Sequence, residues 1–377
     1  SAASDVYKRQ VMDVCSGAIH VVDDVTYDVI ALYEEKSLEE IENELSYSKE
    51  DIEEAYKEVT SLKEEGLLFT EDIYEDYIKE VKSRKTVVKA LCLHIAHDCN
   101  LACRYCFAEE GEYKGHRELM SAKVGKAALD FLVANSGNRH NLEVDFFGGE
   151  PTMNFGVVKE VVEYGRSLEE KHNKHFRFTL TTNGVLLNDE IMEFANKEMD
   201  NVVLSVDGRK EIHDYMRPTR NGKPSYDLIM PKFIRFAESR HQQKYYVRGT
   251  FTNRNLDFSK DVLHLADLGF EQISMEPVVG QPEEPYAIQE KDLPQIFDEY
   301  DRLAKEMIKR EKAGKGFNFF HFMIDLTGGP CVAKRLSGCG SGTEYLAVTP
   351  WGDLYPCHQF VGCLLYTSPS PRDRSVS

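Results

Sequence analysis

Three cysteines lie close together in one short stretch of the chain, with the spacing C-x3-C-x2-C. They are Cys99, Cys103 and Cys106, and they follow an apolar run from Val87 to Ile95. Thiolates at this spacing can ligate one iron–sulfur cube, because cysteine sulfur suits soft, multi-iron sites. A cube has four irons and this loop offers three sulfurs. One iron would therefore stay open for a ligand from outside the protein.

Two other interpretations of these cysteines stay open at this point. A zinc site would need a fourth cysteine or histidine nearby, and His97 is a candidate. Alternatively, the thiols are core residues without a ligand role, which is how we interpret Cys15 and Cys92. The sequence after the loop favours the cluster, because further motifs follow at suitable positions.

The first of these motifs is Gly148-Gly149-Glu150-Pro151, which follows the second predicted strand. Two glycines let a backbone approach a ligand without obstruction by Cβ. One β/α unit after the cysteine loop, this GGEP motif resembles the radical S-adenosylmethionine (radical SAM) superfamily. The resemblance implies a [4Fe-4S] cluster whose open iron chelates the amino and carboxylate groups of S-adenosylmethionine. An electron from the cluster would then cleave this cofactor to methionine and a 5′-deoxyadenosyl radical.

The resemblance also implies cofactor contacts at the ends of the other predicted strands. Carbonyls of the GGEP motif and Glu150 would accept hydrogen bonds from the methionyl ammonium, and polar strand ends would contact the carboxylate and ribose. A small apolar residue after the sixth strand would stack on adenine, and an arginine near the end of the fifth would pair with a carboxylate. The candidate residues are Thr182, Asn183, Ser205, Asp207, Arg248 and Val278. For Ser205 and Asp207, ordinary turn chemistry is an equally good interpretation.

Alternating strand-like and helix-like segments predict the scaffold for these motifs. Strands are expected at 87–95, 142–147, 176–182, 202–206, 245–252 and 272–278, and helices at 121–135, 155–172, 189–196, 226–239, 258–268 and 293–312. Six β/α units predict an α/β fold with a parallel sheet curved into an open, partial (β/α)6 barrel, which we assign to residues 87–290. The cysteine loop would lie at the carboxyl ends of the strands, where such folds place their chemistry.

Residues 11–70 indicate a small separate domain, joined to the barrel by a charged linker at 71–86. A hairpin around Ser16-Gly17, three helices and a return strand at 67–69 are expected. This pattern resembles the winged-helix-like recognition domain of maturases of ribosomally made peptides. Seventeen Asp and Glu against four Lys and Arg would repel nucleic acid, so a leader peptide that adds a strand to the hairpin fits better. An N-terminal structural cap is the alternative.

Residues 291–363 carry more cysteines after their predicted helix. The spacing Cys339-x12-Gly352-x4-Cys357 resembles the opening of a SPASM domain, which binds auxiliary iron–sulfur clusters, and Cys331 would be a third ligand. A complete SPASM domain needs further cysteines, and only one more follows. We therefore expect at least one auxiliary cluster and leave the second open. A pair of structural cysteines in a hairpin is the alternative.

Composition and charge limit the class of protein. A chain of 377 residues can hold two or three domains, and it has neither a membrane-length apolar stretch nor a secretory signal pattern. Nine cysteines suit a reducing compartment, so we expect a cytoplasmic protein without a membrane partner. A net charge of −18 argues against nucleic acid as a partner. Residues 1–10 and 364–377 resemble translated adapter-derived segments, with a natural disordered tail as the alternative for the second.

The nearest resemblance is to the maturases of SCIFF peptides, the six-cysteines-in-forty-five-residues precursors. It is carried by the stretches at 15–23 (CSGAIHVVD) and 354–362 (LYPCHQFVG). It implies thioether cross-links from a Cys sulfur to an α-carbon in a precursor peptide bound through its leader. A low-potential ferredoxin or flavodoxin would supply electrons. If the foreign-looking tail is an artefact, we expect this chain to cleave S-adenosylmethionine but to form little thioether.

Two alternative functions remain open. The first is another SPASM maturase, which would oxidise a sulfatase Ser or Cys or form a carbon–carbon link. The second is a non-catalytic, peptide-binding iron–sulfur electron carrier.

Overall fold

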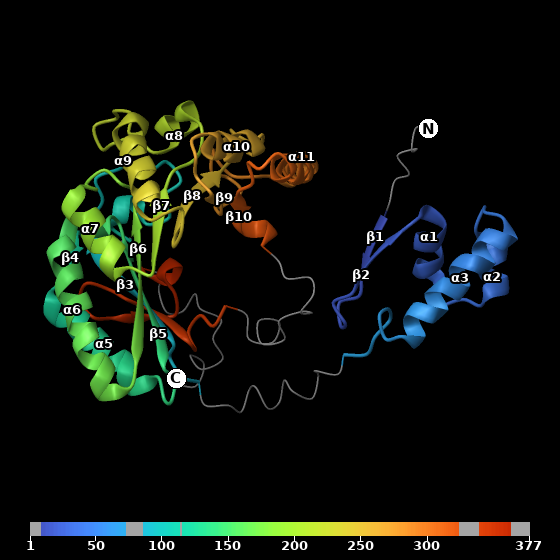
Figure 1. Cartoon of the computed structure of the whole chain (residues 1–377), viewed down its shortest axis with the longest axis horizontal. Coiled ribbons are helices and arrows are strands. Elements are labelled where there is room, and N and C mark those ends of the chain that lie inside the picture. The colour runs from blue at the N-terminus through green and yellow to red at the C-terminus, as the bar shows by residue number, and fades with distance from the viewer. Residues whose placement is uncertain (1–8, 73–85, 114, 324–338, 363–377) are drawn as a thin grey trace. The chain divides into compact units, whose positions relative to one another are not determined.

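The computed structural model describes residues 9–72, 86–113, 115–323 and 339–362 (Figure 1). The chain divides into two compact units. The first comprises residues 1–85 and 324–339, and the second comprises residues 86–323 and 340–377. Among the described residues, no helix combines the length and the hydrophobicity needed to span a bilayer.

The described part of the first unit is a hairpin followed by three helices. Its elements are β1 (Arg9–Met12), β2 (Ile19–Val22), α1 (Asp24–Leu32), α2 (Leu38–Glu44) and α3 (Lys49–Glu64). The two strands are antiparallel, with Met12 opposite Ile19. The helices bury a small core that includes Val29, Ile41 and Ile52. Side-chain caps begin two of them, because Asp23 accepts from the Thr26 amide and Ser48 from the Asp51 amide.

Three details of this unit differ from expectation. The hairpin begins at Arg9 rather than near Val14, so it includes residues from the segment that looked foreign. Cys15 is only half-buried. The return strand at 67–69 is wrong: Leu68 is buried against the helices, and the Phe69 ring stacks on Tyr33 with centroids 5.5 Å apart. These apolar side chains therefore pack on the helical core instead of pairing with the hairpin.

The second unit is built on a mixed sheet whose centre is parallel. Its central strands are β3 (Ala90–His97), β5 (Asn141–Gly148), β6 (His175–Thr182), β7 (Asn201–Ser205), β8 (Tyr245–Phe251) and β9 (Gln272–Pro277). The order β3-β5-β6-β7-β8-β9 follows the chain, and every pair is parallel. The α/β class and the six parallel strands are thus confirmed. In the described residues the sheet forms an open path.

Helices connect these strands (Figure 1). They are α5 (Ala122–Asn135), α6 (Phe155–His172), α7 (Asp189–Glu198), α8 (Lys210–Met216), α9 (Tyr226–Ser239), α10 (Ser259–Asp267) and α11 (Leu293–Lys312). The sequence predicted all of them except α8. That helix has only seven residues, which is too short for a clear helical pattern.

Four short strands extend the sheet. β10 (Asn318–Phe319) pairs in parallel with β9, and β4 (Glu118–Leu119) pairs antiparallel with β3. β11 (Tyr345–Val348) pairs in parallel with β3 and forms a hairpin with β12 (Leu354–Tyr355). β3 lies between β5 and β11, and all eight of its residues are buried, as is typical of a parallel strand whose sheet is covered on both faces. The C-terminal hairpin is therefore part of the sheet beside the strand that leads into the cysteine loop.

Candidate active site

The three cysteines lie in the loop that leaves the carboxyl end of β3. Within the loop, the Cys106 amide donates to the Cys103 carbonyl at 3.1 Å. Burial raises the pKa of the Cys99 thiol to about 12 and raises the pKa of the Cys103 thiol further. Nearby thiols add to both effects, Cys106 acting on Cys99 and both other cysteines acting on Cys103. The three sulfurs therefore share one poorly solvated region.

The Gly148-Gly149 turn at the end of β5 presses against this loop. The Gly149 amide donates to the Ala96 carbonyl at 2.7 Å, and the Glu150 amide donates to the Asp98 carbonyl at 2.8 Å. A Cβ on Gly149 would lie 2.1 Å from the Asp98 oxygen, and Gly148 has φ +119°. A Cβ on Gly148 would lie 2.4 Å from the Ala96 oxygen, and both oxygens belong to the backbone, which cannot rotate away. The glycines are thus needed to hold the loop against β5, in addition to any role in admitting a ligand.

Glu150 is a buried junction between two strand ends. Its carboxylate accepts from the Thr152 amide at 3.0 Å, from the Thr182 hydroxyl at 2.8 Å and from the Asn183 amide at 2.7 Å. Burial raises its pKa, while these hydrogen bonds oppose that rise. Glu150 thereby fixes the end of β6 next to the GGEP turn, and Pro151 begins a short 3-10 helix at Pro151–Asn154.

Asn183 links the end of β6 to the cysteine loop. Its side-chain nitrogen donates to the Asn100 side-chain oxygen at 2.7 Å and lies 3.6 Å from the Cys99 sulfur. Its own side-chain oxygen accepts from the Val185 amide at 3.0 Å. The predicted residues Glu150, Thr182 and Asn183 are therefore brought together with Cys99.

Asp207 reaches the same loop from the fourth strand. Its fully buried carboxylate accepts from the Tyr105 hydroxyl at 2.7 Å, from the Arg217 guanidinium at 3.0 Å and from the Thr250 amide at 3.0 Å. Tyr105 lies between two of the cysteines, so this hydrogen-bond network anchors the loop to Asp207. Losing one partner of a buried ion pair typically costs about 3–5 kcal/mol. We therefore expect Asp207 and Arg217 to be needed for the conformation of the loop.

The sequence did not identify Arg217 as a site residue, and of Tyr105 it indicated only that the aromatic residues beside Cys106 could shield one face of a cluster. Arg217 follows α8, the helix that was not predicted, and no local pattern marks it. Tyr105 had a usable signal, since an aromatic residue between closely spaced cysteines must lie at the site. The end of α8 and the residues after it also form hydrogen bonds with the loop backbone: the Ala102 amide donates to the Pro218 carbonyl and the Arg104 amide to the Met216 carbonyl.

Other candidates lie farther along the sheet. Arg248 on β8 pairs with Glu276 on β9, with 3.6 Å between Nε and Oε1. His321, then Ser274 and Arg248, lower the pKa of Glu276 to about 2, so it is ionised at neutral pH. Ser205 is half-buried and lies opposite Arg248 in the sheet register. Val278 follows β9 and is half-buried.

The C-terminal hairpin brings a further cysteine toward the loop. Cys357 is half-buried, and its sulfur lies 3.7 Å from Nδ1 of the adjacent His358. The His358 ring contacts Phe107, the residue after Cys106, with centroids 5.8 Å apart. The predicted hairpin around Gly352 is present: β11 and β12 pair antiparallel, and Gly352 has φ +97° in the turn between them.

The other two predicted auxiliary ligands are Cys331 and Cys339. Cys331 lies outside the described residues, and Cys339 is exposed. The segment after Cys339 is nevertheless hydrogen-bonded to the segment before Cys357, because the Gly342 amide donates to the Pro356 carbonyl at 3.0 Å.

The zinc interpretation fits this geometry poorly. Ligands of one zinc ion lie about 4 Å apart, because Zn–S bonds are about 2.3 Å long. No group of three or more Cys, His, Asp or Glu in the described ranges is gathered closely enough to hold a single ion. His97 is turned toward His94, with their ring nitrogens 2.9 Å apart. Three neighbouring thiols in a dry loop instead fit a wider group, an iron–sulfur cluster with one open iron.

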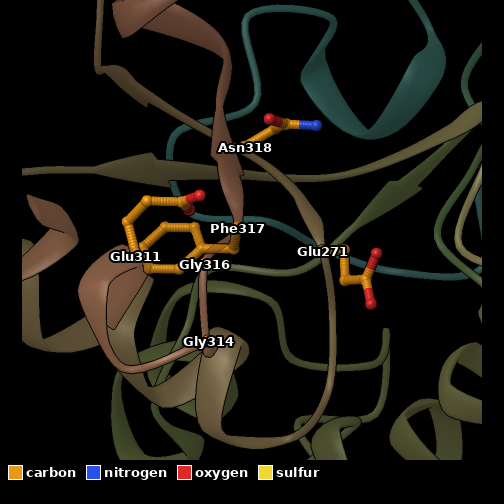
Figure 2. Close-up of a pocket in the computed structure, with 6 residues that line it drawn as sticks. All are labelled: Glu271, Glu311, Gly314, Gly316, Phe317 and Asn318. Atoms are coloured by element: carbon orange, nitrogen blue, oxygen red, sulfur yellow. The ribbon is translucent and has the colours of Figure 1, made fainter.

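A cavity of about 350 Å³ lies away from this site (Figure 2). It is lined by Glu271, Glu311, Gly314, Gly316, Phe317 and Asn318. Glu271 precedes β9 and Asn318 begins β10, so the cavity is at the amino ends of the strands. The cysteine loop is at the carboxyl ends, and we therefore assign this cavity no part in its chemistry.

Comparisons with known proteins identify a family and several relatives. Residues 93–240 match the model of the Radical SAM superfamily. The chain is 30% identical over 223 residues to the uncharacterized protein MJ0907 of Methanocaldococcus jannaschii, covering 58% of this chain and 71% of that protein. It is 29% identical over 280 residues to the cysteine-type anaerobic sulfatase-maturating enzyme of Clostridium novyi, covering 70% of this chain and 71% of the enzyme.

Solved structures share the fold. The structure of anSMEcpe with bound AdoMet superimposes with a TM-score of 0.61 at 21% identity, covering 72% of this chain and 75% of that one. Streptococcus suis SuiB bound to the precursor peptide SuiA gives a TM-score of 0.53 at 16% identity, covering 94% and 81%. With the cysteine loop and the parallel sheet, these findings show that the chain belongs to the radical SAM superfamily and is a radical SAM enzyme, with anaerobic sulfatase-maturating enzymes among its relatives.

Proposed function

We propose that this enzyme matures a ribosomally made, cysteine-rich precursor peptide of the SCIFF type by installing thioether cross-links. The observation that carries the proposal is the contact between Phe107 and His358. Each of these residues directly follows a cysteine, Cys106 in the loop and Cys357 in the C-terminal hairpin. Two thiol-bearing segments therefore meet on one side of β3. SuiB, which shares the fold, was solved with its precursor peptide.

The chemistry of a thioether defines what the two segments must do. The S–Cα bond forms while a Cα–H and an S–H bond break, so one hydrogen atom, one proton and one electron must leave. When bound, the cluster and S-adenosylmethionine supply the radical that takes the hydrogen atom. Cys331, Cys339 and Cys357 are the residues that would hold an auxiliary cluster, which would supply an acceptor for the electron.

The protein's own residues prepare this chemistry by holding the loop and excluding water. Glu150 and Asn183 fix the loop from β5 and β6, and Asp207 fixes it through Tyr105. Tyr113 is buried beside Cys92 and Ala347 in a small apolar cluster to which Cys106 also belongs. A dry, rigid surrounding limits side reactions of a reactive intermediate.

The test is an anaerobic assay of the reconstituted enzyme with dithionite and a synthetic cysteine-rich precursor. We expect 5′-deoxyadenosine from this chain. From a version in which an artefactual tail at 364–377 is replaced by the natural sequence, we also expect a peptide that has lost two hydrogens for each cross-link and has fewer alkylatable thiols. Deoxyadenosine without any change in the peptide in that version, for every cysteine-rich precursor encoded near the gene, would contradict the proposal.

A second candidate follows from the Clostridium novyi relative, whose name describes a cysteine-type anaerobic sulfatase-maturating enzyme. This candidate function is oxidation of a Ser or Cys in a sulfatase substrate. Such oxidation yields a carbonyl group, whereas a thioether does not. Capture of the product with a hydrazide reagent therefore separates the two functions.

We further propose that the hairpin of the first unit binds the leader of the precursor. Met12, Ile19 and Val21 are apolar yet exposed, Met12 to 58% and Val21 to 57%. Strand addition to a hairpin edge uses such side chains for specificity. The acidic excess of residues 11–70 would select a basic leader.

Replacing Ile19 and Val21 together with Ser should therefore raise the KM for the precursor by about tenfold or more, since each buried apolar contact contributes about 1.5 kcal/mol or more. Peptide-independent deoxyadenosine formation should change little. Ser61→Ala, on the exposed face of α3, is the matched control without a charge change and should leave the KM unchanged. Equal KM values for both proteins would remove the hairpin from peptide recognition.

A further inference from the structure

A second cavity, of about 280 Å³, lies beside the cysteine loop. Its lining consists of Arg104, Tyr215, Met216, Arg254, Pro285 and Tyr286. The guanidinium carbons of Arg254 and Arg104 lie 4.0 and 4.4 Å from the centroid of the Tyr215 ring. Arg104 also donates from Nε to the Tyr215 carbonyl at 2.7 Å. Two cationic groups are therefore held on one aromatic ring, which restricts them to a defined arrangement.

The charge of this surface is opposite to that of the chain. Arg104, Arg254 and Tyr215 are all exposed. Within the described ranges, no carboxylate lies within ion-pairing distance of either guanidinium, whereas Arg217 and Arg220 next to the loop are paired with Asp207 and Asp98. With a net charge of −18, most of the chain would repel an anionic partner. Two unpaired guanidinium groups would attract such a partner to this face.

The face is also close to the predicted cluster ligands. Arg104 follows Cys103 directly, so their Cα atoms are about 3.8 Å apart. Tyr215, Arg254 and Tyr286 follow β7, β8 and β9, so the cavity lies at the carboxyl ends of the strands, as the loop does.

We propose that this face, defined by Arg104, Tyr215 and Arg254, is the docking site of a small acidic one-electron carrier protein. One electron leaves the carrier, which is oxidised by one electron, and enters the site held by Cys99, Cys103 and Cys106, which is reduced by one electron. No bond forms or breaks. The superfamily reaction requires this electron whatever the peptide substrate is, so the inference does not depend on the proposed function.

The precursor peptide is the less favoured occupant. The acidic first unit selects a basic leader, and a basic segment would be repelled by two unpaired arginines. An acidic carrier is instead repelled by most of the chain and attracted here, which would orient its redox centre toward the loop.

The test measures the oxidation of flavodoxin hydroquinone by the reconstituted enzyme under anaerobic stopped-flow conditions. Arg254→Glu should lower the second-order rate constant by about tenfold or more at low salt, and the difference should shrink as salt screens the charges. Arg254→Lys should retain most of the rate. Arg139→Glu makes the same charge change near the amino end of β5 and should match the parent.

Iron content and dithionite-supported deoxyadenosine formation separate docking from damage to the site. Both should be unchanged in Arg254→Glu. Equal flavodoxin rates for the Arg254→Glu and Arg139→Glu proteins would overturn the proposal, and so would a loss of dithionite-supported cleavage. A raised peptide KM with an unchanged flavodoxin rate would assign the face to the peptide and would also overturn it.

Discussion

Replacing Cys103 with Ala is expected to abolish 5′-deoxyadenosine formation. Cys103 lies at the centre of the loop and is followed by Arg104 and Tyr105, whose contacts hold the loop to α8 and to Asp207. Removing groups outside the ligands of a metal site already costs about 10–100-fold in affinity or activity. Loss of a ligand itself should therefore reduce cleavage by more than about 100-fold.

The measurement compares iron content, the cluster absorbance and deoxyadenosine yield after reconstitution. Cys92→Ala is the matched control, because Cys92 is a buried thiol on β3 that the structure packs among apolar neighbours. Burial keeps the pKa of Cys92 well above its ordinary value, so it stays a neutral thiol. Thermal melts of the metal-free proteins test whether both variants fold. A Cys103→Ala protein that folds, loads iron and still cleaves S-adenosylmethionine would disprove the assignment of the loop.

The strands of the sheet could be predicted because they are buried on both faces. Such strands appear in the sequence as apolar runs between amphipathic helices, and β3 has no exposed residue. The motifs could be grouped as a site for a related reason. In a parallel sheet the carboxyl ends of successive strands meet at one edge, so the cysteine loop, Glu150 and Asn183 were expected to be neighbours.

What could not be predicted depends on contacts between distant residues. Tyr105 and Asp207 are 102 positions apart, and the network closes only through Arg217 after the short helix α8. The pairing of β11 with β3 also has no local signal, because a four-residue strand fits many partners. The Lys89–Glu344 ion pair at the start of these strands links positions 255 residues apart. Sequence therefore located the motifs, and the packing of the chain determined what each one contacts.

Replacing Cys357 with Ala is expected to have the second large effect, which differs in kind from the first. The cross-linked product should fall below detection while deoxyadenosine formation stays within about twofold of the parent, because Cys357 lies on the C-terminal hairpin and not in the loop that carries Cys103. The Asp207, Glu150 and Asn183 contacts that hold the loop do not involve the hairpin. A surface substitution that removes no buried contact usually changes the free energy of unfolding by less than about 0.5 kcal/mol. Replacing the half-buried Cys357 should lower that free energy by little more.

Mass spectrometry of the precursor and chromatography of deoxyadenosine give both readouts from one reaction. Cys15→Ala, which removes a half-buried thiol from the first unit, controls for the loss of a cysteine and should leave both products unchanged. The two cysteine variants then separate the steps, since Cys103→Ala loses both products and Cys357→Ala loses one. Cross-linking at the parental rate by Cys357→Ala would show that the hairpin cysteine takes no part in product formation. Equal loss of cleavage in both variants would mean instead that the two segments form a single site, since the Phe107–His358 contact would then transmit the change from the hairpin to the loop.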